Sequence, residues 1–153
     1  MGILVQASSH VEIFDNDIGD NDTINIAIVT YGFETDDENY YPHPRSIQIH
    51  GNRFGKSGYN PDLETGELAK ILYELSDGNM PHIFWDGIVP LPQILFGQPK
   101  EEKIVFGDNG DASFLTINAL KYILPFFDPI DQNYDDYVGE IKPLPPVILS
   151  ERL

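Results

Sequence analysis

The fold class is decided by residues 103–117, which read Lys-Ile-Val-Phe-Gly-Asp-Asn-Gly-Asp-Ala-Ser-Phe-Leu-Thr-Ile. Two apolar runs, 103–106 and 112–117, flank a polar segment centred on Asn109-Gly110. Asn-Gly favours a two-residue hairpin turn because both residues accept the positive φ angles that a type I′ turn requires. The stretch therefore predicts a β-hairpin, and with it an antiparallel sheet.

Other segments add strands to this predicted sheet. Residues 23–33 are rich in β-branched side chains that alternate with polar ones, and residues 45–50 alternate in the same way. Residues 1–14 alternate more loosely and are expected to form an edge strand. Residues 81–99 contain four prolines, each of which removes a ladder donor, so they predict short strand pieces or packed loop.

Two helices are predicted. The first has apolar residues at i, i+3, i+4 and i+7, namely Leu68, Ile71, Leu72 and Leu75. The second is expected to begin at Asn118 as its cap and to stop at Pro125. No internal repeat or linker is evident. We therefore predict one α+β domain over residues 1–153, an antiparallel sheet with both helices packed on one face. An acidic loop is expected near 34–44 and an extended, Pro-rich C-terminal tail near 142–153.

The amino-acid composition argues against several classes of function. The chain has 153 residues, with 25 acidic against 9 basic side chains and a net charge of −16. Its 41% hydrophobic and 12% aromatic content indicates a folded protein and not an acidic disordered tail. The charge argues against a nucleic-acid or anionic-membrane binder, because phosphate affinity comes from Lys and Arg. The lack of Cys, of a signal-peptide pattern and of a long apolar run predicts a cytoplasmic protein.

The sequence contains partial matches to ion-binding and phosphate-binding motifs, but none of these motifs is complete. The acidic loop 15–22 lacks the Gly and Glu that an EF-hand places at positions 6 and 12. Residues 51–57 resemble a phosphate loop but have three residues between the glycines instead of four. The four His residues have no metal-ligand spacing. We therefore predict no catalytic residue, no metal, no cofactor and no enzymatic activity. The single Trp85 is interpreted as a core anchor, with an interface role as the alternative.

The acidic charge is concentrated in two segments. Residues 1–44 hold nine acids and residues 128–140 hold five, and neither segment contains Lys or Arg. Parts of both also carry Tyr, whose amphipathic ring suits a protein interface. Such a surface would attract a basic protein from a distance and then bury its rings on contact. The alternative is an acidic surface that only keeps the protein soluble. The predicted partner-binding residues are Asp36, Asp37, Glu38, Tyr40, Tyr41, Tyr134, Asp135, Asp136 and Tyr137.

Residues 68–124 carry a family resemblance. The helix ending Leu72-Tyr73-Glu74-Leu75, then Pro81, the pair Trp85-Asp86 and Asp111 before an apolar run resemble small acidic bacterial immunity proteins of polymorphic or contact-dependent toxin systems. The resemblance implies a cytosolic protein that inhibits a secreted toxin domain, often a basic nuclease.

Three functional hypotheses follow. The first is a non-enzymatic inhibitor that binds a cationic toxin domain through its acidic, Tyr-bearing surface. The second is a phage- or plasmid-encoded DNA mimic that occupies the basic groove of a defence protein, which would place carboxylates in rows like duplex phosphates. The third is a metal-dependent or hydrolytic enzyme, which would bring His50 or His82 together with carboxylates in a cleft.

Overall fold

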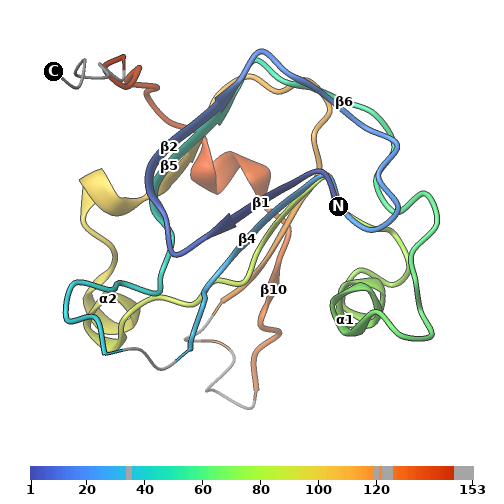
Figure 1. Ribbon diagram of the computed structural model, residues 1–153, viewed down its shortest axis with the longest axis horizontal. Helices are drawn as coiled ribbons and strands as arrows, with labels where there is room; N and C mark the ends of the chain where they lie inside the picture. Colours follow the sequence, from blue (N-terminus) through green and yellow to red (C-terminus); the bar gives the residue numbers. More distant parts are fainter. Residues whose placement is uncertain (34–35, 119–120, 122–125, 147–153) are drawn as a thin grey trace, which may run out of the picture.

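The computed structural model describes residues 1–33, 36–118, 121 and 126–146 (Figure 1). Their strands form three sheets. Sheet A consists of β1 (Ile3–Gln6), β4 (Ile26–Val29), β7 (Ile83–Trp85), β9 (Phe114–Ile117) and β10 (Ile130–Asp131). Sheet B consists of β2 (Ser9–Phe14), β5 (Arg45–His50) and β8 (Ile104–Phe106), and sheet C of β3 (Asp17–Ile18) and β6 (Arg53–Phe54).

The chain visits the three sheets in a repeated order and so winds into a coil. It runs through A, B and C twice and then returns to A, B and A. From β4 to β9, each strand pairs in parallel with the strand of the same sheet one turn earlier. Figure 1 looks down this coil, whose turns lie one behind another. This arrangement is a parallel β-helix, in which each turn packs on its neighbours.

The prediction of an antiparallel sheet is wrong. Only β9 and β10 pair in antiparallel fashion among the described strands. The expected hairpin does not form, because β8 pairs with β5 in sheet B whereas β9 pairs with β7 in sheet A. Asn109-Gly110 instead turns the chain from one side of the coil to the next. Gly110 has a positive φ of +60° but Asn109 does not, so the turn is not the type I′ turn that this dipeptide favours in hairpins.

Rows of side chains directed into the coil form its core. Parallel pairing in register places residues of successive turns directly above one another. One row of sheet A contains Ile3, Ile26, Ile83 and Phe114, the next contains Val5, Ile28, Trp85 and Thr116, and sheet B contributes Ile13, Ile49 and Phe106. Trp85 is therefore a core residue, as predicted, with 6% of its surface exposed.

A ladder of asparagines holds the corner between sheets B and C. Asn52 Oδ1 accepts hydrogen bonds from the backbone N and the Nδ2 of Asn16, at 3.1 Å each. Asn52 Nδ2 donates to Asn109 Oδ1 at 3.0 Å and to the Ile13 carbonyl at 2.9 Å. Asn52 and Asn109 are both buried. The ladder satisfies corner backbone groups that the strands leave without partners, so it fixes how the turns stack.

The ladder also reveals an internal repeat, contrary to the prediction that none exists. Each turn ends sheet B with an apolar residue followed three positions later by Asn, as in Ile13 and Asn16, Ile49 and Asn52, and Phe106 and Asn109. The offset is 36 residues between the first two asparagines and 57 between the second and third. Because inserted loops and helices make the turns unequal, no fixed period marks the repeat in the sequence.

The helices lie outside the coil. The first predicted helix is confirmed as α1 (Glu67–Leu75), and its Leu72 packs with Ala27, Phe84 and Leu115 on the outer face of sheet A. Residues 91–96, expected as strand or loop, form a second helix, α2 (Leu91–Phe96). The helix predicted to run from Asn118 to Pro125 lies mostly outside the described residues, although Lys121 N donates to Asn118 Oδ1 at 3.1 Å. Neither α1 nor α2 is long and apolar enough to cross a membrane.

The C-terminal segment runs along the outer face of sheet B. Lys142 N donates to Gln48 Oε1 at 2.6 Å, and Leu144 N donates to Glu12 Oε2 at 3.0 Å. Residues 141–146 belong to no helix or strand, and residues 147–153 of the predicted extended tail lie outside the described chain.

Docking of this tail is expected to depend on pH. The Leu144 amide, and secondarily His50, lower the pKa of Glu12 below its ordinary value. A carboxyl with a lowered folded-state pKa stabilises the docked tail above its ordinary pKa, and this contribution is lost as the pH falls through the folded value. The protection factor of the Leu144 amide, its exchange rate compared with the intrinsic rate at the same pH, should therefore fall at acidic pH, and Glu12→Gln should remove most of this pH dependence. An unchanged exchange profile in Glu12→Gln would contradict this assignment.

Candidate functional site

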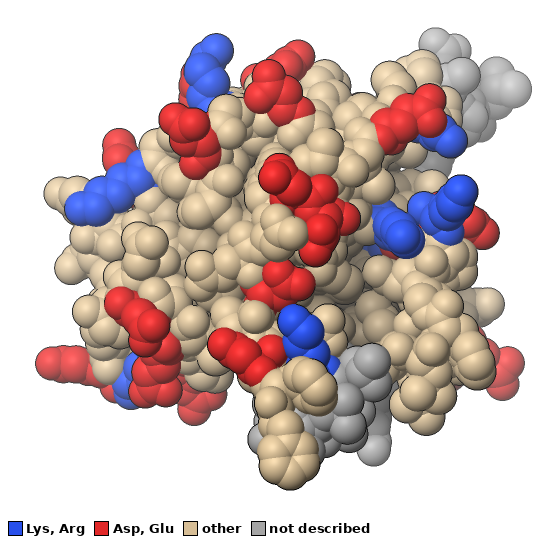
Figure 2. All heavy atoms as spheres, turned by 180° about the vertical axis from the view of Figure 1, so that it is seen from behind, with Lys and Arg blue, Asp and Glu red and all other residues tan. Residues whose placement is uncertain are grey.

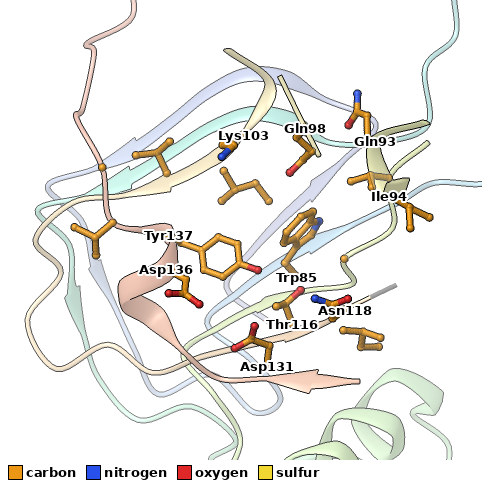
Figure 3. Close-up of a pocket in the computed structure, with 17 residues that line it drawn as sticks. Trp85, Gln93, Ile94, Gln98, Lys103, Thr116, Asn118, Asp131, Asp136 and Tyr137 are labelled. Atoms are coloured by element: carbon orange, nitrogen blue, oxygen red, sulfur yellow. The ribbon is translucent and has the colours of Figure 1, made fainter. Parts of the chain in front are cut away.

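A pocket of about 540 Å³ opens beside the last turn of the coil (Figure 3). Sheet A supplies one wall through β7, β9 and β10, and β8 supplies another. The inner side of α2, the end of the 3-10 helix η2 (Tyr134–Tyr137) and the two residues after it complete the pocket. The labelled lining residues are Trp85, Gln93, Ile94, Gln98, Lys103, Thr116, Asn118, Asp131, Asp136 and Tyr137.

Three lining residues stand in one row across neighbouring strands. Trp85 on β7 is in register with Thr116 on β9, and Thr116 is in register with Asp131 on β10. Trp85 and Thr116 continue an inward row that begins with Val5 and Ile28, so the core row becomes polar where it reaches the pocket.

Two polar atoms of this row have no partner within the described protein. They are the indole Nε1 of Trp85 and the hydroxyl Oγ1 of Thr116. Both residues are almost completely buried, with 6% and 1% of their surface exposed. A buried polar group that makes no hydrogen bond costs about 1–3 kcal/mol, so native proteins rarely contain one without a reason.

The charges around the pocket are mixed. Burial, followed by the nearby Asp131 and Asp136, raises the pKa of Tyr137 to about 12, so its hydroxyl is neutral near neutral pH. Figure 3 shows this hydroxyl directed toward Thr116 and Trp85. Asp131 Oδ1 accepts a hydrogen bond from Asn133 N at 2.9 Å, which fixes that carboxylate on the pocket wall. Lys103 approaches from the opposite side of the pocket in Figure 3.

The second predicted acidic segment lies over the end of the core. The Tyr134 ring stacks on Phe106, and the Tyr137 ring contacts Trp85 and Phe114. These two rings are therefore packed against the coil. Asp135 and Asp136 are exposed, so from this segment the side chains best placed for a partner are carboxylates.

Tyr134 also ends the asparagine ladder. Its hydroxyl accepts a hydrogen bond from Asn109 Nδ2 at 2.7 Å and donates one to the Gly107 carbonyl at 3.0 Å. We expect Tyr134→Phe to lower the free energy of unfolding by about 1–3 kcal/mol, because both partners lose a hydrogen bond in a half-buried place. Urea denaturation measures this loss. Tyr59→Phe, which changes an exposed Tyr, is the control, and equal effects of the two substitutions would contradict the role given to Tyr134.

The first predicted acidic segment lies in the loop between β4 and β5, away from η2 (Figure 1). Asp36, Asp37 and Glu38 are exposed. The Tyr40 hydroxyl donates to the Tyr31 carbonyl, and the Arg45 guanidinium lies 3.9 Å from the centre of the Tyr41 ring. The two acidic segments thus occupy separate places in the fold, and the described part of the predicted loop begins at residue 36.

Asp86 ties this loop to the segment that contains α2. Its carboxylate accepts hydrogen bonds from Thr30 N at 2.6 Å and from Ile88 N at 3.1 Å. Burial raises the pKa of Asp86, and these two amides counteract that rise. The two residues of the pair Trp85-Asp86 therefore have different roles. The indole faces the core and the pocket, whereas the carboxylate joins two surface segments.

Sequence reasoning missed the exposed apolar side chains of α2 and of the segments around it. No residue of α2 is buried, and Leu91, Leu95 and Phe96 are 62%, 60% and 87% exposed. Large side chains of the neighbouring segments are exposed as well. We call the following residues the loop–helix patch: Tyr31, Phe33, Asp36, Asp37, Glu38, Ile88, Leu91, Leu95 and Phe96. Reading residues 91–96 as a helix would have revealed it, because one turn then brings Leu91 and Leu95 together.

The His residues do not gather into a catalytic or metal-binding group. His50 Nε2 lies 2.9 Å from Glu12 Oε1, but the other oxygen of Glu12 receives the Leu144 amide. His82 contacts Ser113, whose backbone N donates to His82 Nδ1 at 2.9 Å. In the part of the chain that the structure describes, no group of three or more His, Cys, Asp or Glu side chains could hold a metal ion.

Searches against protein-family models, curated proteins and solved structures found no match to this chain.

Proposed function

We propose that the protein is a non-enzymatic inhibitor that binds a basic protein through the loop–helix patch. The observation that carries this proposal is α2, a helix without a buried residue that exposes Leu91, Leu95 and Phe96. Asp86, shortly before this helix, is bonded to Thr30 at the start of the loop that holds the acids 36–38. Exposed apolar groups of this size beside polar residues are typical of protein interaction sites. The resemblance to immunity proteins suggests that the partner is a toxin domain.

Charge supports a basic partner. The chain has 25 acidic and nine basic side chains, so even complete pairing of Lys and Arg would leave 16 carboxylates without one, and pairs such as Asp17–Arg53 and Lys142–Glu140 do not change the net charge of −16. Figure 2 shows acidic side chains over much of one face in separate groups, with Lys and Arg between some of them. A DNA mimic would be supported by a continuous row of carboxylates, so this distribution favours a protein partner with local basic regions.

Charge and apolar contact should contribute to different steps of binding. The acids should speed association, because complementary charge steers encounter, whereas the apolar side chains should slow dissociation. With a toxin domain encoded next to the gene as the partner, Asp36→Asn with Asp37→Asn should lower the association rate about tenfold at low salt and little at high salt. Phe96→Ser should instead raise the dissociation rate by about tenfold or more.

Matched controls lie elsewhere on the surface. Tyr59→Ser removes an exposed ring outside the patch, and Asp135→Asn with Asp136→Asn neutralises the other acidic segment. Stopped-flow binding and survival of cells that express the toxin domain would provide the readouts. Full binding and protection by the Phe96→Ser variant would reject the patch. Loss of salt dependence only in the Asp135 and Asp136 variant would move the interface to η2.

A further inference from the structure

The pocket at the end of the coil has a chemistry that the proposed protein interface does not use. Gln93 and Ile94 of α2 line it, whereas the exposed Leu91, Leu95 and Phe96 of the same helix belong to the loop–helix patch. The two places are therefore separable by substitution.

The row Trp85, Thr116 and Asp131 defines which ligand could complete the pocket. The indole N–H can only donate, the hydroxyl can donate and accept, and an ionised carboxylate can only accept. Trp85 Nε1 and Thr116 Oγ1 are without partners in the described chain although both residues are more than nine-tenths buried. A complementary molecule must therefore offer acceptors to the first two groups and donors to the third.

Charged ligands satisfy this row poorly. An anion would meet two carboxylates, Asp131 and Asp136. A guanidinium or ammonium group would suit them, but such a group carries only donors and cannot accept from the Trp85 indole. Lys103 also approaches the pocket from the opposite wall. A neutral molecule with donors and acceptors on the same groups meets all of these requirements.

We propose that the pocket binds a neutral polyhydroxylated ligand, with a hexose unit as its basic element. Each hydroxyl both donates and accepts, and several hydroxyls around one ring can reach the polar groups that surround the pocket, including Asn118 and Tyr137. A single amide offers only one acceptor and one donor group, so it would leave more of the lining without partners. The ring of Tyr137, which lines the pocket and is only partly buried, provides apolar surface for the C–H groups of the ligand. The volume of about 540 Å³ lies within the range of small-molecule sites.

The single tryptophan of the chain makes the site directly observable. Trp85 fluorescence should change saturably when the protein is titrated with at least one member of a panel of glucose, galactose, mannose, N-acetylglucosamine, maltose, cellobiose and lactose. Thr116→Val keeps the shape but removes the hydroxyl, and Asp131→Asn removes the charge. Each should weaken binding about tenfold or more. Asp128→Asn is the matched control, because Asp128 also accepts a backbone N–H two residues ahead but does not line the pocket.

Stability distinguishes a ligand site from a structural one. Thr116→Val removes a buried hydroxyl that has no partner, so its thermal midpoint should equal or exceed that of the parent protein. Weaker sugar binding with an unchanged or higher midpoint would confirm the proposal. It is overturned if no sugar of the panel gives saturable binding, if Thr116→Val binds as well as the parent, or if only arginine methyl ester or acetamide binds. None of these outcomes depends on the loop–helix patch, so the proposed inhibitor function is tested separately.

Discussion

Replacing Asn52 by leucine is expected to lower the free energy of unfolding by about 3–5 kcal/mol, although the two side chains have similar size. Asn52 bonds to both other asparagines of the ladder and to the Ile13 carbonyl. Leucine would leave the Asn16 amide and the Ile13 carbonyl without these partners, and each such group costs about 1–3 kcal/mol when buried. The loss should exceed that of most single substitutions, because one side chain serves three turns of the coil.

Urea denaturation followed by Trp85 fluorescence and by circular dichroism measures this loss. Asn39→Leu, an exchange at an exposed position in the β4–β5 loop, is the control and should change stability by less than about 0.5 kcal/mol. A loss below about 1 kcal/mol for Asn52→Leu would show that the ladder does not hold the turns together.

Gly87→Ala should be more damaging still, with an expected loss above about 4 kcal/mol or a protein that does not fold. A Cβ at Gly87 would lie 1.7 Å from the carbonyl oxygen of Ile117 and 2.8 Å from its carbonyl carbon. Since these are backbone atoms, the clash cannot be relieved by turning a side chain, and β7 and β9 would have to separate. The positive φ of +68° adds strain.

Gly97→Ala isolates the contribution of the dihedral angle. Gly97 has a φ of +83°, but an added Cβ would meet nothing within 4 Å. Its ψ of 157° together with this φ defines a backbone conformation that is essentially restricted to glycine, so we expect this variant to lose about 1–3 kcal/mol from backbone strain alone. Thermal and urea unfolding of the two variants should differ by several kcal/mol. If they were equally stable, the close approach of Gly87 to Ile117 would have no energetic importance.

Local properties of the fold were predictable, whereas the pairing of strands was not. The apolar stripe of α1 and the alternation around Ile47 and Ile49 identify their elements correctly, since both depend on residues close in sequence. Pairing between β8 and β5 depends on residues far apart in the chain. Asn109-Gly110 has the turn chemistry of a hairpin, and nothing local shows that the flanking strands join different sheets.

The candidate site was likewise predictable from the sequence only in its local features. The sequence correctly indicated Trp85 as a core residue and the 36–38 acids as exposed. It could not show that Tyr134 and Tyr137 cover the end of the core, because their ring contacts with Phe106 and Phe114 are made across the fold. The row of Trp85, Thr116 and Asp131 was equally hidden, since it exists only once three distant strands lie side by side.

The coil also suggests how such a protein can acquire new activities. The long excursions of the chain, residues 30–44, 55–82 and 86–103, all leave the ends of strands, so they can change in length while the register between turns persists. The acids of the first excursion and the exposed helix of the third both reside in such segments. Exchange of these segments, in evolution or by protein engineering, would therefore leave the asparagine-stabilised coil in place.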